Sequence, residues 1–303
     1  MEYILHLFIL ICFYTLLSQS LNLCAGYTGL ISLAHAGFYG IGAYTTAILS
    51  TTFGFSFWMS IPLAMLFSGV MALIVSLIAL RTVEDYFIIC TLGIQVILFS
   101  MMNNLVDLTR GPLGIPGIPS IQLFGLSLDS KISFLWFSLF FVAIVWLALR
   151  NISKSGFGKT LTAISEDEIY TQGIGKNVYL SKTVSFSLSA MFAAIPGMLY
   201  AHYISYIDPT SFTVNESIFI LSIVIIGGLG NLTGSFLAAA FLVLLPEALR
   251  FVGMPDSIAA NMRQIIYGLI LVIVMMTGKN GVKELFTKKI SYLKRNAGTE
   301  NRK

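Results

Sequence analysis

The sequence predicts an all-α membrane protein, a polytopic transmembrane helix bundle of about eight or nine spans. Of its 303 residues, 56% are hydrophobic and only 11% are charged, and the mean hydropathy is +0.86. Soluble domains contain about 25% charged residues, because they must cover an apolar interior with polar surface. The net charge of +4 does not indicate nucleic-acid binding, since the basic residues gather near the ends of the apolar runs.

Apolar runs close to the ~17–25 residues that cross a bilayer define the expected spans. They are Ile4–Ser20, Ser32–Ser50, Ile61–Leu80, Phe87–Met102, Ile132–Leu149 and Val184–Tyr203, followed by three shorter runs, Ile218–Ile226, Phe236–Leu249 and Ile265–Met276. We interpret the first run as a retained span, because no basic segment precedes it as in a secretory signal. Ile218–Ile226 is too short to cross alone and is expected to be half of a broken helix.

Charge predicts the orientation and the domain limits. Residues 1–278 are expected to form the membrane domain, with a polar loop at about 151–182, and residues 279–303 a basic tail. The loop is bracketed by Arg150, Lys154, Lys159, Lys176 and Lys182, and the tail holds Lys279, Lys283, Lys288, Lys289, Lys294, Arg295, Arg302 and Lys303. Because short cytoplasmic segments are enriched in Lys and Arg, both are expected on the cytoplasmic side. The Gly/Pro-rich loop Arg110–Pro119 is expected outside.

Within the polar loop, Ala163–Gly175 is an acidic, amphipathic island between apolar runs. A membrane protein that exposes a short soluble helix between spans usually offers it to a soluble partner. The alternative is an ordinary solvated loop helix, since solvated charge runs are common.

Two nucleotide-binding patterns are incomplete. Ser153–Thr160 has Ser where a phosphate-binding loop requires Gly, and an apolar span precedes it instead of a buried strand. Gly228–Thr233 has Thr in place of the third Gly of a dinucleotide fingerprint. We therefore expect no ATPase site and no cofactor in this chain. The cysteines Cys12, Cys24 and Cys90 lie in or beside apolar runs without disulfide or metal spacing, so no metal is expected.

Glycines mark two candidate helix breaks, Gly26–Gly42 and Gly227–Gly234. Broken helices occur at membrane depth where protein or a water-filled cavity satisfies the backbone, and a pair of them indicates a translocation path. Close helix packing is the alternative, and the stripes Ala36/Gly40 and Ala193/Gly197/Ala201 favour it locally. The candidate pathway residues are Ser32, His35, Gly37, Gly40, Tyr44, Gly227, Gly228 and Gly230.

His35 has two interpretations. An ionisable residue inside a membrane run is a candidate functional residue. A neutral imidazole that packs the bundle is the other, since a neutral His is far cheaper to bury than a fixed charge.

Several segments in order resemble the LivM-type permeases of branched-chain amino acid ABC importers. The segment Asn22–Tyr44 resembles the N-terminal signature of that family, and the similarity continues through Asp85–Leu92, Gly111–Pro119, Gly158–Ile174, Ile226–Ser235, Leu245–Arg250 and Arg263–Val274. The family commonly has Arg where Ser165 stands and small alanines near Thr171 and Gln172, which affects how the island would dock.

The resemblance implies that the island is the cytoplasmic coupling helix of an ABC permease. Its coupling residues would be Lys159, Glu166, Asp167, Glu168 and Gly173. The three acids would form the helix start, where carboxylates interact favourably with the helix dipole, and Gly173 and Gly175 would end it. The implied partners are a second homologous permease subunit, two ATP-binding subunits and an external substrate-binding protein, and the implied cargo is a branched-chain amino acid. The implied location is the bacterial cytoplasmic (inner) membrane, and the chain itself would catalyse no reaction.

Two other transport functions stay open. Relatives within the family carry urea or short amides. An ion-coupled secondary transporter would share the composition but would carry intramembrane carboxylates. Glu247 is expected to be the only acid near a late span, and a pair with Arg250 three residues later explains it without a proton relay.

Overall fold

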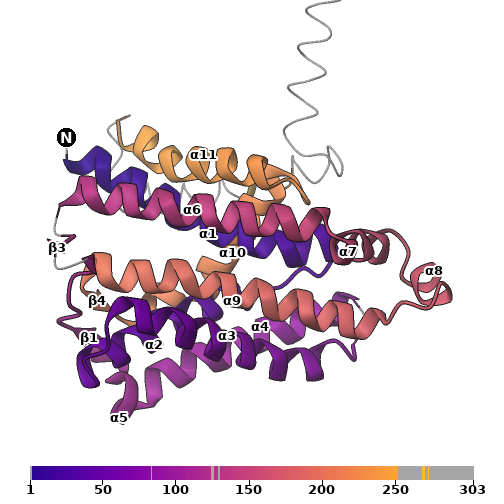
Figure 1. Ribbon diagram of the computed structural model, residues 1–303, viewed down its shortest axis with the longest axis horizontal. Helices are drawn as coiled ribbons and strands as arrows, with labels where there is room; N and C mark the ends of the chain where they lie inside the picture. The colour runs from indigo at the N-terminus through magenta and orange to yellow at the C-terminus, as the bar shows by residue number, and fades with distance from the viewer. Residues whose placement is uncertain are drawn as a thin grey trace, which may run out of the picture.

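The computed structural model describes residues 2–82, 84–123, 126–128 and 130–251, together with positions 268, 269 and 272. Over this part the chain forms a bundle of long helices that run side by side, with short connections at both ends (Figure 1). Apart from those three positions, the expected last run Ile265–Met276, the segment Arg263–Val274 and the basic tail 279–303 lie outside the described residues.

Each of the first eight expected runs corresponds to one helix, which confirms the predicted all-α class, although Ser32–Ser50 begins three residues before its helix. The helices that carry them are α1 (Glu2–Thr28), α2 (His35–Thr52), α3 (Phe57–Ala79), α4 (Glu84–Asn104), α6 (Lys131–Lys154), α9 (Val178–Ile204), α10 (Val214–Gly227) and α11 (Leu232–Phe251). Shorter elements connect them: α5 (Val106–Thr109), α7 (Gly156–Glu166), α8 (Glu168–Gly173), and the 3₁₀ turns η1 (Gly111–Leu113) and η2 (Pro209–Phe212).

The number of complete crossings is smaller than expected in the described residues. Five helices are long and apolar enough to cross a membrane, namely α1, α3, Tyr86–Asn104 of α4, α6 and α9. Helix α10 has 14 residues, about 21 Å at 1.5 Å per residue, which is shorter than the ~30 Å hydrocarbon core. The polytopic helical architecture is therefore present, and the expected total of eight or nine spans is not confirmed in the part of the chain that the structure describes.

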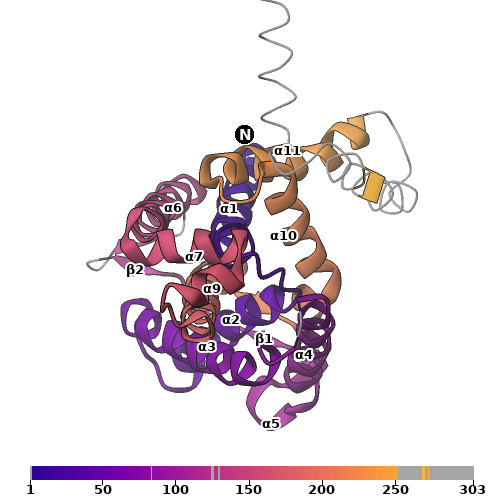
Figure 2. The ribbon, with the colours of Figure 1, turned by 90° about the vertical axis from the view of Figure 1, so that its right-hand side faces the viewer.

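Helices α2 and α9 lie in the middle of the bundle and pack closely against each other (Figure 2). A Cβ atom added at Gly42 would fall on the backbone of Ala194, and one added at Gly197 would fall on the carbonyl oxygen of Tyr39. Membrane helices associate largely through such close van der Waals packing of small residues. The predicted tight contact through Ala193, Gly197 and Ala201 is confirmed, since both alanines are fully buried.

Short strands fix the loops at one end of the bundle. Strand β1 (Ile115–Pro116) pairs antiparallel with β4 (Tyr206–Ile207), and β2 (Gln122–Leu123) pairs with β3 (Leu126–Ser127). The first pair holds the Gly/Pro-rich loop against the connection between α9 and η2. Helices α7 and α8 lie at the opposite end (Figure 1). The island and the Gly/Pro-rich loop are thus separated by the full length of the bundle.

The α2–α9 contact predicts a difference between two helical glycines. Gly42→Ala should destabilise the protein by about 1–3 kcal/mol, because its methyl group overlaps the backbone of α9. Gly93→Ala is the matched control, since nothing lies within 4 Å of a Cβ added there, and it should be neutral or stabilising by up to about 1 kcal/mol. Thermal unfolding in detergent measures both. Equal midpoints for the two variants would contradict the importance of this contact.

Candidate functional site

The first broken helix is present between α1 and α2, where residues 29–34 are not helical. Gly29 begins the break with a positive φ of 77° and lies against Ser165 of α7, at the end of the bundle that carries the island. The segment then returns into the bundle, where Leu33 N–H donates to Thr91 Oγ1 at 3.1 Å. Ser32 is fully buried, and its hydroxyl accepts from Ala34 N–H at 3.2 Å. Protein groups therefore satisfy the irregular backbone, as membrane depth requires.

The starts of α2 and α10 meet at one side chain, Gln95 of α4. Its Oε1 accepts from Gly37 N–H at 2.7 Å, and its Nε2 donates to the carbonyl oxygen of Phe212 at 2.8 Å. Ser217 donates to the same Oε1 at 3.4 Å and accepts from Ala36 N–H at 3.0 Å. Gln95 is fully buried. A single amide thus joins two partial helices that are distant in sequence.

His35 is held by α1. Its Nε2 lies 2.7 Å from Ser20 Oγ, and Ser20 donates its own hydroxyl proton to the carbonyl oxygen of Leu17 at 2.8 Å. The serine oxygen therefore accepts from an Nε2–H of the imidazole. Because the His35 ring is buried and engaged in this way, the geometry favours the packing interpretation over a pathway-lining role.

Gly40 and Tyr44 both face Phe212 of η2. A Cβ added at Gly40 would meet Phe212 and Met102, and the ring of Tyr44 lies 5.9 Å from the Phe212 ring. Tyr39 and Tyr200 complete this aromatic cluster, at 5.0 and 6.2 Å from Phe212. The Tyr44 hydroxyl is buried without a hydrogen-bond partner in the part of the chain that the structure describes. Phe212 therefore fills the space on which two of the predicted pathway residues converge.

The second break is also present, between α10 and α11. Helix α10 ends at Gly227, and Gly228 and Gly230 adopt positive φ angles of 90° and 76°. Asn22 of α1 holds this turn, since its Oδ1 accepts from Gly230 N–H at 2.7 Å and its Nδ2 donates to Ser235 Oγ at 2.9 Å. The three predicted glycines thus form a turn fixed to α1.

Sequence analysis did not identify three polar residues of these breaks: Asn22, Gln95 and Glu216. Glu216 lies in the first turn of α10, is half-buried, and accepts a hydrogen bond from the Tyr14 hydroxyl of α1. The expectation that Glu247 is the only acid near a late span is therefore wrong. The sequence signal that could have identified these three residues is an amide or carboxylate side chain within an apolar run or at its start.

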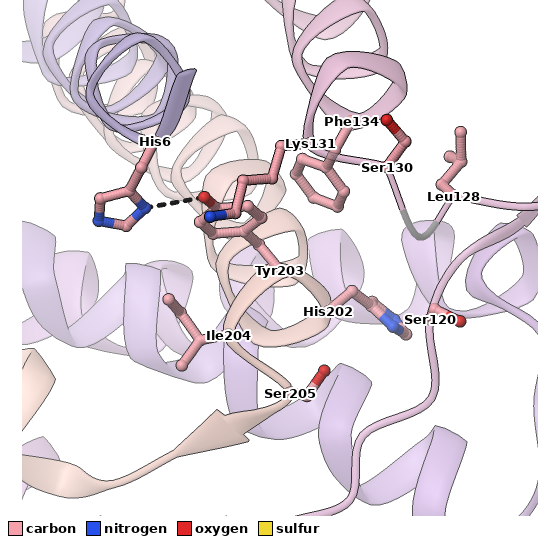
Figure 3. A pocket seen from close by; sticks show the side chains of 10 residues that line it. All are labelled: His6, Ser120, Leu128, Ser130, Lys131, Phe134, His202, Tyr203, Ile204 and Ser205. Atoms are coloured by element: carbon pink, nitrogen blue, oxygen red, sulfur yellow. Dashed lines mark hydrogen bonds between the residues drawn. The ribbon is translucent and has the colours of Figure 1, made fainter. Parts of the chain in front are cut away.

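A separate pocket of about 380 Å³ lies where α1 begins and α9 ends (Figure 3). His6 Nδ1 lies 2.8 Å from the Tyr203 hydroxyl in it, and Lys131 forms an ion pair with Glu2 at 3.1 Å. None of the predicted pathway residues lines it. The lining residues are His6, Ser120, Leu128, Ser130, Lys131, Phe134, His202, Tyr203, Ile204 and Ser205.

The predicted single helix of the island is two helices, α7 and α8. Asp167 is extended (φ −153°), and its carboxylate accepts from Tyr170 N–H at 2.9 Å, which ends α7 and caps α8. Glu166 therefore lies in the last turn of α7 and not at a helix start, which corrects that expectation. Gly173 is the last residue of α8, as expected. Glu168 forms an ion pair with Lys182 of α9 at 2.5 Å.

The two island helices differ in burial. Leu161 and Ile164 of α7 are buried against the bundle, and Lys159 is exposed. Helix α8 and its C-terminal flank instead expose apolar side chains, with Ile169 83% exposed, and Tyr170 and Ile174 also exposed. Asp167 and Glu168 thus position α8, and Ile169, Tyr170 and Ile174 contribute apolar side chains to its exposed surface, beside the exposed Gln172.

The fold is that of a multi-span helical membrane protein with two broken helices. The family model described as the permease component of the branched-chain amino acid transport system matches residues 3–275. The chain belongs to this family.

Curated relatives agree with this assignment. The chain is 34% identical over 260 residues to the high-affinity branched-chain amino acid transport system permease protein LivM of Salmonella typhimurium, and 33% identical to that of Escherichia coli; each match covers 78% of this chain and 61% of the relative. The chain thus spans about 61% of the length of these relatives. The guanosine ABC transporter permease protein NupQ of Bacillus subtilis is 24% identical over 230 residues, 71% of each chain. No solved structure matches.

The Gln95 contacts predict a large loss of stability on their removal. Gln95→Leu should lower the free energy of unfolding by about 1–3 kcal/mol, because it leaves the buried carbonyl oxygen of Phe212 without its partner and removes one of the two acceptors of Gly37 N–H, which also donates to the carbonyl oxygen of Ala34. Gln19→Leu is the control, since Gln19 is also buried but its Oε1 has no partner among the described residues, and its loss should be smaller. Denaturant or thermal unfolding of both variants measures the difference. A loss at position 19 as large as at position 95 would contradict this role.

Proposed function

We propose that the chain is the membrane permease subunit of an ATP-binding-cassette importer. It would form half of the translocation pathway for branched-chain amino acids that an external binding protein delivers. Two ATP-binding subunits would hydrolyse ATP, and a second homologous permease would supply the other half of the pathway. Family membership supports the proposal, and so do the names of the LivM relatives.

One observation carries the proposal, namely the apolar surface of α8. A solvated loop helix would place polar side chains outward, but here Ile169, Tyr170 and Ile174 are exposed outside the apolar length of the bundle. Exposed apolar patches on polar segments mark protein–protein contacts. The Glu168–Lys182 ion pair fixes this surface to α9, so that movement of a docked subunit would be transmitted to the bundle. We therefore assign the coupling role to α7 and α8, residues 156–173.

Charge supports a cytoplasmic position for this end. The end with α7 and α8 has Lys and Arg at positions 81, 150, 154, 159, 176 and 182. The opposite end has Arg110 in its Gly/Pro-rich loop and Lys131 at the start of α6. By the positive-inside rule, α7 and α8 would face the cytoplasm of a bacterial inner membrane, and the Gly/Pro-rich loop would face the binding protein.

The proposal predicts ATP-dependent uptake by the complete transporter in vesicles. Leucine, isoleucine or valine should accumulate only with ATP and loaded binding protein, and guanosine and urea serve as comparison cargoes. The presence of Glu216 makes an ion-coupled carrier the alternative to test, because intramembrane carboxylates mark ion routes. Uptake that continues without the ATP-binding subunits, or that stops when ion gradients are dissipated, would contradict the proposal.

The α8 surface predicts a docking defect. Ile169→Asp should reduce co-purification of the ATP-binding subunits about tenfold or more, because it places a charge in an apolar contact. Leu113→Asp is the matched control, since Leu113 is 79% exposed at the opposite end of the bundle. Its co-purification should stay within about twofold of wild type. Equal effects of the two substitutions would count against α8 as the docking surface.

A further inference from the structure

Glu216 lies at mid-depth of the bundle. The next residue, Ser217, contacts Gln95 of α4, and Gln95 is 11 residues from the start of α4 and 9 from its end. At 1.5 Å per residue this places the first turn of α10 roughly 14–17 Å from either end of α4. Tyr14, which donates to the Glu216 carboxylate, is similarly central in α1, roughly 18–21 Å from its ends. The carboxylate is thus far from both ends of the bundle.

No cation neutralises this carboxylate in the described part of the chain. The two ion pairs there are Lys131–Glu2 and Lys182–Glu168, at opposite ends of the bundle. A carboxylate at this depth is costly without a positive partner, and such residues are usually functional. Its position at the start of α10 offsets part of that cost through the helix dipole, but does not supply a counter-ion.

A capping role does not account for Glu216. The sequence Thr213-Val-Asn-Glu216 fits a capping box, in which Thr and Glu side chains bond to each other's backbone N–H groups. Thr213 is the N-cap of α10, but its side chain makes no capping hydrogen bond, and the Glu216 carboxylate accepts from Tyr14 of α1. The carboxylate is therefore directed to another helix and not to its own.

Aromatic side chains lie near the start of α10: Tyr14 donates to Glu216, and its ring is 4.9 Å from that of Phe219. Tyr39 and Tyr200 lie close enough to interact electrostatically with Glu216, and their ring centroids are 5.7 Å apart. A carboxylate near aromatic side chains suits an alkylammonium group, which can form an ion pair with the carboxylate and a cation–π contact with a ring. Glu216 is only half-buried, so the described residues do not cover its side chain completely. A cargo could reach it from the pathway shared with a second permease.

We propose that Glu216, positioned by Tyr14, binds the ammonium group of the amino acid cargo at mid-depth of the pathway. This inference rests on the proposed function. It assigns the transporter's specificity for a cargo with a positively charged group to the carboxylate of Glu216. Binding is an ion pair that forms and breaks during passage, and no covalent step or proton transfer is involved.

The test uses the complete transporter in vesicles with saturating leucine-loaded binding protein, and measures leucine taken up per ATP hydrolysed. Glu216→Gln should lower this ratio about tenfold or more, because the isosteric amide keeps the packing and removes the charge. Glu216→Asp should restore part of the ratio, and Tyr14→Phe should reduce it less than Glu216→Gln. Glu247→Gln in α11 is the control and should stay within about twofold of wild type.

The possible outcomes distinguish failure of the ammonium site from failure of the proposed function. Co-purified partner subunits verify that each variant assembles. If wild type takes up leucine and Glu216→Gln does so with an unchanged ratio, the ammonium site is wrong and the proposed function stands. Equal impairment by Glu216→Asp and Glu216→Gln would show that packing and not charge matters, which also overturns the site. If the wild-type transporter takes up no leucine, the proposed function fails and the ammonium site fails with it.

Discussion

The structure depends on satisfying backbone polar groups where helices stop inside the bundle. Two helices, α2 and α10, begin in the interior, where water is not available to the free N–H groups of their first turns. Gln95 and Ser217 accept from Gly37 and Ala36 of α2, and Gln95 also donates to the carbonyl oxygen before α10. These contacts stabilise the interior starts of α2 and α10, and they fix the backbone of Phe212, around which the aromatic cluster packs.

A structural feature could be predicted from the sequence when it depends on residues that are close together in the chain, and not when it depends on contacts between distant residues. Apolar runs are local features, so eight helices were placed correctly, and glycine clusters located both breaks. The contacts that stabilise the breaks are long-range: Gln95 bonds to groups 58 and 117 residues away, and Asn22 bonds to one 208 residues away. A polar residue in an apolar run shows only that a partner is needed. Which partner it has depends on how the helices assemble, and the sequence pattern does not contain that information.

The island illustrates the same limit on a smaller scale. Its acidity was visible in the sequence and predicted a helix start. A short backbone excursion at Asp167 divided the segment, however, and gave the three acids three different positions. Glu166 ends α7, Asp167 caps α8, and Glu168 binds Lys182. Asp167 and Glu168 already bind groups of this chain, and Glu166 lies on a different helix. The exposed side chains of Ile169, Tyr170 and Ile174 are therefore the more suitable surface for a partner. The acidic residues identify the segment in the sequence, but the exposure of its side chains in the structure determines which of them can contact a partner.

Helix α9 connects the two candidate regions physically. It binds α8 through Lys182 near its start and packs against α2 through Ala194 and Gly197 some 12 to 15 residues further along. Helix α2 in turn shares Gln95 with the start of α10, next to Phe212 and Glu216. A displacement of α8 would therefore reach the aromatic cluster through packed helices and one amide, with no flexible loop in the route. Phe212 fills the space between Gly40 and Tyr44 in this structure, so cargo could pass along the proposed pathway only if η2 moved relative to α2. The Gln95 amide, which donates to the carbonyl oxygen of Phe212, is then the contact that such a movement would break or rearrange.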